Sequence, residues 1–154
     1  MKDYSIMFNV ALDIANLAHA RQKTRNGDPY ILHPMQVALF VETMRQKVIA
    51  ILHDAIEDAE PDERNWVANE IRGLGDGIYD DVVALTRDEG IEYSDYVDNL
   101  VRHGSTDAIM VKLADLKHNM DLGRLHTITN KDIERNKKYS KVNDHLTTYL
   151  EEMQ

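Results

Sequence analysis

Residues 48–56 form the segment that most restricts how this chain can fold. They read Val-Ile-Ala-Ile-Leu-His-Asp-Ala-Ile, so a helix here is apolar on nearly every side. Such a helix is stable only when other helices surround it, and we therefore expect it at the centre of the fold. The two polar residues within it, His53 and Asp54, need partners, because burying either group alone costs several kcal/mol.

The rest of the chain also has helical periodicity, since apolar residues recur every three or four positions and few runs alternate as strands do. Turn residues such as Gly27, Pro29 and Gly104 separate the periodic segments. The pattern predicts an all-α bundle of about seven to eight helices in a single domain covering residues 1–154. The expected helices span about 3–22, 34–44, 48–58, 61–73, 76–85, 94–102, 105–122 and 131–151.

Composition limits the kinds of partner and metal site. The 154 residues include no cysteine, so any bound metal must be held by imidazole and carboxylate groups. The formal net charge is −9, and an acidic chain without a long basic stretch is not expected to bind nucleic acid or an anionic membrane. Asp3 and Asp13 interrupt the apolar residues near the amino terminus, so no signal peptide or membrane span is predicted there. We expect a cytoplasmic protein, and the sequence leaves open whether it forms a homo-oligomer.

Two imidazoles and two carboxylates, distant along the chain, are candidates for one metal site. His53 and Asp54 lie in the apolar central segment, and Asp115 lies midway along another apolar helix. His33 ends the loop before the second helix. This set suits manganese, iron or zinc better than calcium or magnesium, which prefer oxygen ligands.

Six of the eleven residues from Asp54 to Arg64 are acidic, which is common at a solvated helix start. Glu57 and Asp58 fit that explanation less well, because they project from the turn immediately after His53 and Asp54. A carboxylate in that position could orient or deprotonate a metal-bound water.

Asp115 and its neighbours also have a simpler explanation. A buried ion pair with Lys112 or Arg124 would account for this carboxylate without a metal. Asn119 lies four residues further on, on the same helical face. It is either a supporting amide or a donor to the sugar of a substrate.

Arg21, Lys23 and Arg25 form the densest basic cluster in the first hundred residues. An anionic substrate on an acidic protein needs such a counterweight, although a solvated turn explains the cluster equally well. His19 and His118 are each either a partner of a metal ligand or a packed core histidine.

Four stretches of the sequence resemble the motifs of a known family. They read Ala-His-Ala-Arg-Gln-Lys at 18–23, Gly-Asp-Pro-Tyr-Ile-Leu-His-Pro at 27–34, Leu-His-Asp-Ala-Ile-Glu-Asp at 52–58, and Lys-Leu-Ala-Asp followed by His-Asn-Met within 112–120. In that order they resemble the hydrolase domain of RelA/SpoT enzymes, which belongs to the HD superfamily. The resemblance covers about residues 8–126. The length is similar to that of the small alarmone hydrolases.

The resemblance implies an HD-domain helical bundle that removes the 3′-pyrophosphate from guanosine tetra- or pentaphosphate. It implies one manganese ion, with iron, zinc or cobalt as alternatives, held by His33, His53, Asp54 and Asp115. Glu57 and Asp58 are expected to handle the attacking water. The residues expected to contact or border the nucleotide are Lys23, Arg25, Tyr30, Lys112 and Asn119.

One departure from the family pattern keeps other functions open. Thr24 and Arg25 stand where the long enzymes have an Arg-Lys pair that meets the base and phosphates. The substrate could therefore be another nucleotide, such as a nucleoside monophosphate, an adenine alarmone or NADPH. A third alternative is a nucleotide-sensing module without catalysis, against which the intact Glu57-Asp58 pair argues.

Overall fold

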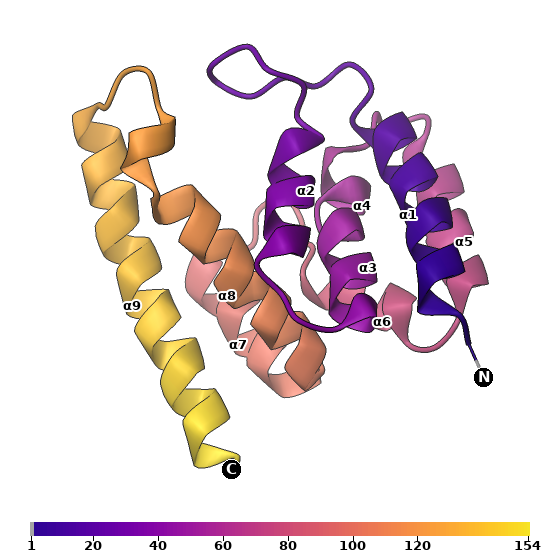
Figure 1. Cartoon of the computed structure of the whole chain (residues 1–154). Coiled ribbons are helices and arrows are strands. Elements are labelled where there is room, and N and C mark those ends of the chain that lie inside the picture. The colour runs from indigo at the N-terminus through magenta and orange to yellow at the C-terminus, as the bar shows by residue number, and fades with distance from the viewer. Residues whose placement is uncertain (1) are drawn as a thin grey trace.

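The structure, a computed structural model, describes residues 2–154, and the regular elements in that range are all helical (Figure 1). The predicted all-α fold class is confirmed. The α-helices are α1 Tyr4–Ala18, α2 Leu32–Leu39, α3 Met44–Leu52, α4 Ala55–Asp58, α5 Arg64–Leu74, α6 Ile78–Ala84, α7 Tyr93–His103, α8 Thr106–Met120 and α9 Asn130–Glu152, with a 3₁₀-helix at Leu122–Arg124.

Helix α3 lies at the centre of the bundle, as the apolar segment predicts. It contacts α1, α2, α6 and α8, and each residue from Val48 to Leu52 is fully buried. Its first turn is closed by a capping box, in which the Thr43 side chain accepts from the backbone N–H of Gln46 and the Gln46 side chain accepts in return. The central position of α3 brings its carboxyl end next to both α2 and α8.

The predicted continuous helix over residues 48–58 is wrong, because α3 ends at Leu52 and α4 begins at Ala55. His53 and Asp54 occupy a turn between the two helices. The carbonyl oxygen of Ala50 accepts both the backbone N–H of His53, at 3.4 Å, and its ring Nδ1–H, at 2.6 Å. This side-chain bond competes with the regular helical ladder. The break also explains why residues 2–154 contain nine α-helices where about seven to eight were expected.

Helix α2 begins at Leu32, two residues before the start predicted at Pro34. His33 therefore lies in the first turn of the helix and not in the preceding loop. The early start is compatible with Pro34, because the N–H groups of a first turn have no helical acceptor and a proline loses nothing there. Elsewhere α7 ends at Gly104, one of the predicted turn residues, and the side chain of Ser105 caps α8.

The last two long helices, α8 and α9, pack side by side at one edge of the bundle (Figure 1). The loop before α2 and the loop before α9 lie at the same end of the molecule, at the top of the view. None of the helices in residues 2–154 combines the length and apolar character that crossing a bilayer requires.

Candidate metal centre

The four predicted ligands meet where α2, α8 and the turn after α3 approach one another. Ligand atoms of His33, His53 and Asp115 all lie within 4.8 Å of one another, and all three residues are buried. Asp54 lies beside them, with its Oδ2 3.2 Å from Nε2 of His53 and 3.6 Å from Nε2 of His33. We call these four residues the metal cluster, since such a set can hold a divalent metal ion.

The ring of His53 is oriented as a metal ligand requires. Its Nδ1–H donates to the carbonyl of Ala50 at 2.6 Å, so Nε2 is the ring nitrogen that faces the cluster. That Nε2 is buried and forms no hydrogen bond with the residues that the structure describes, although carboxylate oxygens of Asp54 and Asp115 lie 3.2 and 3.4 Å away. A buried, unbonded imidazole nitrogen facing two carboxylates fits a bound cation.

His33 has a partner on its other ring nitrogen. Its Nδ1 lies 2.7 Å from Nδ1 of His118, and its Nε2 lies 2.9 Å from Oδ1 of Asp115. Burial, followed by the charge of His33, lowers the pKa of His118 to about 4, so His118 is neutral near pH 7 and can accept a hydrogen bond. The sequence left His118 open between a partner of a metal ligand and a core residue, and the structure places it against His33, one of the predicted ligands.

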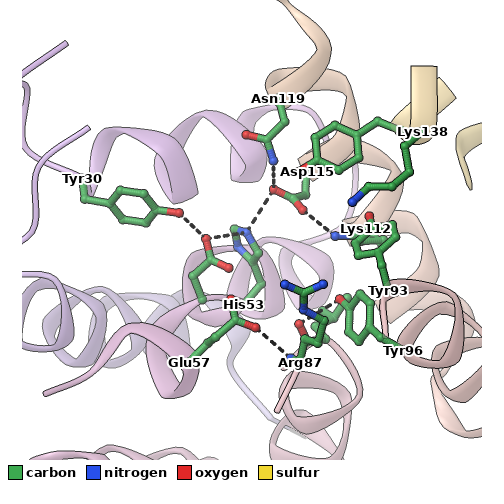
Figure 2. Close-up of a pocket in the computed structure, with 13 residues that line it drawn as sticks. Tyr30, His53, Glu57, Arg87, Tyr93, Tyr96, Lys112, Asp115, Asn119 and Lys138 are labelled. Atoms are coloured by element: carbon green, nitrogen blue, oxygen red, sulfur yellow. Dashed lines mark hydrogen bonds and ion pairs between the residues drawn. The ribbon is translucent and has the colours of Figure 1, made fainter. Parts of the chain in front are cut away.

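Asp115 has two further partners on its own helix, α8. Lys112 Nζ lies 3.0 Å from Oδ2, and Asn119 Nδ2 donates to Oδ1 at 2.9 Å (Figure 2). Burial opposes the charged form of Lys112, but the charge of Asp115 outweighs it and raises the pKa of Lys112 well above its ordinary value. The ion pair considered from the sequence is present, and it coexists with the contacts to His33.

Glu57 and Asp58 face different neighbours. Glu57 lines the cavity beside the metal cluster and accepts a hydrogen bond from the backbone N–H of Arg87 at 2.7 Å (Figure 2). Asp58 turns toward His19, whose Nδ1 lies 3.9 Å away. Burial and the nearby charge of Asp54 raise the pKa of Asp58 to about 7. Glu57 is therefore the carboxylate that borders the open space.

That cavity, about 210 Å³ in volume, joins the metal cluster to three cationic side chains. They surround the ring of Tyr93, with Lys138 Nζ 4.4 Å, Lys112 Nζ 5.6 Å and the guanidinium carbon of Arg87 5.7 Å from its centroid. The buried hydroxyl of Tyr93 forms no hydrogen bond within residues 2–154. We call Arg87, Tyr93, Lys112 and Lys138 the cation pocket, after the three cationic side chains in it. Because these side chains are positively charged in a chain of net charge −9, the pocket is suited to an anion.

A second cavity, of about 520 Å³, is lined by His33 of the metal cluster. Tyr30 and Asn119 line both cavities, and the Tyr30 hydroxyl donates to Oδ2 of Asp54 at 2.6 Å. Of the predicted basic residues, Arg25 lines the second cavity, whereas Lys23 is exposed and lines neither cavity. The predicted nucleotide-contacting residues other than Lys23 therefore border one or both of these spaces.

Comparisons with known proteins find relatives in one group of enzymes. No protein-family model matches the chain. The guanosine-3′,5′-bis(diphosphate) 3′-pyrophosphohydrolase of Borreliella burgdorferi is 30% identical over 119 residues, which are 71% of this chain and 18% of the relative. The probable GTP pyrophosphokinase of Mycobacterium leprae is 33% identical over 120 residues, 71% of this chain and 15% of the relative. The chain thus spans less than a fifth of these two relatives.

A solved structure, that of a metazoan orthologue of SpoT described as hydrolysing ppGpp, superposes with a TM-score of 0.72. It is 23% identical and the match covers 95% of this chain and 88% of that one. The predicted resemblance to RelA/SpoT enzymes is confirmed. The RelA/SpoT-like fold accounts for the all-helical bundle, in which α2, α3 and α8 contact one another.

Sequence reasoning missed part of this RelA/SpoT-like site. Arg87, Tyr93 and Lys138 belong to none of the recognised motifs, yet they form most of the cation pocket. Lys138 is one of several lysines on the polar helix α9, and nothing local distinguishes it from the others. Only the packing of α9 on α8 shows which of them reaches the cavity.

Proposed function

We propose that this chain hydrolyses guanosine tetra- or pentaphosphate and removes the 3′-pyrophosphate. The observation that carries the proposal is that a single cavity is bordered by metal-cluster residues and by the cation pocket. A divalent ion beside side chains that can neutralise phosphate charge is what phosphoryl chemistry requires. The names of the relatives, a 3′-pyrophosphohydrolase and a ppGpp-hydrolysing SpoT orthologue, support the choice of substrate.

Manganese is the resident ion in this proposal, with iron, zinc or cobalt as alternatives. Two imidazoles and two carboxylates form the cluster, and this mixed nitrogen and oxygen set favours transition metals over calcium and magnesium. When bound, the ion supplies Lewis-acid activation of the attacking water and of the phosphoryl oxygen.

The side chains around the cavity have separate tasks. Glu57, oriented by the N–H of Arg87, accepts a proton from the attacking water. The water oxygen forms a bond to the phosphorus attached to the 3′ oxygen, the bond between that phosphorus and the 3′ oxygen breaks, and pyrophosphate leaves while the 3′ hydroxyl regains a proton. Lys112 and Lys138 neutralise the charge that develops on the phosphates.

The direct test is pyrophosphate release from guanosine tetraphosphate by the purified, manganese-loaded protein. We expect one pyrophosphate for each nucleotide consumed, and we expect Asp54→Ala to abolish both metal retention and turnover. Absence of pyrophosphate release, under conditions in which a RelA/SpoT-type hydrolase is active, would reject the proposal.

A nucleotide panel separates this proposal from its alternatives. The panel contains guanosine tetraphosphate, an adenine alarmone, NADPH and nucleoside monophosphates, each assayed for phosphate and for pyrophosphate. Turnover confined to monophosphates or NADPH contradicts the guanosine alarmone proposal. Tight nucleotide binding without turnover in any metal indicates a sensing module.

A further inference from the structure

Arg25 is held by groups from the far end of the chain. Its Nη1 donates to Oδ1 of Asp132 at 2.6 Å, and its Nη2 donates to Oδ2 of Asp132 at 2.9 Å and to the carbonyl of Thr127 at 2.6 Å. The Asp132 side chain is only 1% exposed. A two-pronged pair of this kind fixes the orientation of the guanidinium as well as its position.

The neighbouring residue makes a second connection to the same segment. The Asn26 side chain donates from Nδ2 to the carbonyl of Arg124 at 2.7 Å and accepts from the backbone N–H of His126 at 3.2 Å. Two consecutive side chains of the loop before α2 therefore bind the segment that leads into α9. Figure 1 shows the two segments at the same end of the bundle.

Asp132 itself is held in place by the start of α9. Its Oδ2 accepts from the backbone N–H and from the hydroxyl of Thr129, at 2.8 and 2.9 Å, and completes a capping box. Further along the same helix, Lys138 lines the first cavity. Arg25 lines the second cavity. The Arg25–Asp132 ion pair therefore joins α9, which contributes Lys138 to the first cavity, to the loop that contributes Arg25 to the second cavity.

We propose that Arg25 is a positioning residue whose ion pair with Asp132 holds the loop of residues 22–30 against the start of α9, and that it does not bind substrate phosphate. The donors of Arg25 that face Asp132 are already used, and a phosphate would have to displace a buried carboxylate to reach them. The loop also carries Tyr30, which bonds Asp54 of the metal cluster. Loss of the Arg25–Asp132 ion pair therefore changes the shape of the proposed nucleotide site without removing any residue of the metal cluster.

This inference rests on the proposed function for its kinetic test, which compares Arg25→Ala, Asp132→Asn and the double variant. Asparagine keeps an oxygen for the cap of α9 and removes the charge. We expect both single variants to raise the KM for guanosine tetraphosphate by a similar factor of about 5 to 20, with kcat changed by less than about 2-fold. The double variant should be no worse than either single variant, because both remove the same interaction.

Arg135→Ala is the matched control, since Arg135 approaches the same carboxylate at 3.6 Å from within α9. It should leave KM and kcat unchanged. A direct phosphate contact by Arg25 gives a different pattern: Arg25→Ala raises KM, whereas Asp132→Asn frees the guanidinium and leaves KM unchanged or lower. That pattern would overturn the proposal.

Amide hydrogen exchange in the nucleotide-free protein tests the same idea without any catalysis. Arg25→Ala and Asp132→Asn should each speed exchange at the amides of Thr24 and Gly27, which the loop's own hydrogen bonds protect, and Arg135→Ala should not. Unchanged exchange in both variants contradicts the positioning role even if the protein is an active hydrolase. Faster exchange in a protein that turns over no nucleotide supports the positioning role and rejects only the proposed function.

Discussion

The Nδ1 atoms of His33 and His118 lie 2.7 Å apart, so one of the two rings donates a hydrogen bond to the other. The rings also stack, with centroids 5.0 Å apart and planes inclined by 17°. Since His118 is neutral near pH 7, it can accept the Nδ1–H of His33, which directs the other ring nitrogen, Nε2, toward Asp115. This pair therefore fixes which ring nitrogen of His33 points into the metal cluster.

We expect His118→Ala to weaken binding of manganese by about 10-fold or more, because His33 loses the acceptor that orients it. Titration calorimetry of the metal-free protein measures the affinity directly. His126→Ala, at an exposed histidine, is the control and should bind manganese like the parent protein. Equal affinities for all three proteins would show that His118 does not support His33.

We expect Glu57→Gln to retain the metal and to lower kcat by about 100-fold or more, because the amide cannot accept a proton from water. The amide oxygen can still accept the hydrogen bond from the N–H of Arg87, so the loop should stay in place. Metal content and pyrophosphate release are measured on the same sample. Full activity in this variant would show that another group accepts the proton. Glu60→Gln, at an exposed position three residues further along the chain, controls for the loss of a carboxylate.

We expect Asp115→Ala to destabilise even the metal-free protein, by about 3 kcal/mol, because it leaves the buried ammonium of Lys112 without its carboxylate. Urea unfolding in the presence of a chelator gives the free energy of unfolding. Adding Lys112→Met should recover most of the loss, since the unpaired charge is then gone. If the double variant is as unstable as Asp115→Ala, the ion pair is not the cause.

The raised pKa of Asp58 predicts a pH-dependent stability. The folded chain holds the proton up to about pH 7, whereas an unfolded chain releases it near the ordinary value of 3.8. Between these values the folded state binds more protons, so the free energy of unfolding falls as pH rises through this window. Asp58→Asn should therefore be more stable than the parent at pH 8, by on the order of a few kcal/mol, and should show no gain near pH 4.

The measurement for Asp58→Asn is urea unfolding of the metal-free protein at several pH values. Asp62→Asn serves as the control, because Asp62 is exposed in the following turn. A gain in stability that does not depend on pH would mean that the asparagine acts through packing and not through the loss of a proton.

The parts of the fold that were predictable from sequence are those with a local cause. The apolar run in α3 implied its central position, and Gly104 marked the break between α7 and α8. The break at His53 had no such cause, since His-Asp inside an apolar run is compatible with a helix. It depends on the bond from the His53 ring to the Ala50 carbonyl, which the sequence does not specify.

The site divides in the same way. The ligand candidates were recognisable because polar groups in apolar segments need partners, and the motif order supported the choice. The cation pocket was not recognisable from the sequence. Arg87 lies on a loop and Lys138 on a polar helix, and charged residues are common in both places. The basic residues before α2 suggested phosphate contacts in the same way. Only the fold shows that Arg25 is paired with the carboxylate of Asp132.

The turn between α3 and α4 has a consequence for protein design. In a regular helix, adjacent side chains point about 100° apart, so a His-Asp pair placed there directs its two groups away from each other. Here the pair leaves the helical path, and the carbonyl of Ala50 fixes the ring that precedes the carboxylate. The smallest portable version of this half-site is therefore the five-residue stretch 50–54 with its bend, and grafting the two ligands alone onto another scaffold should fail.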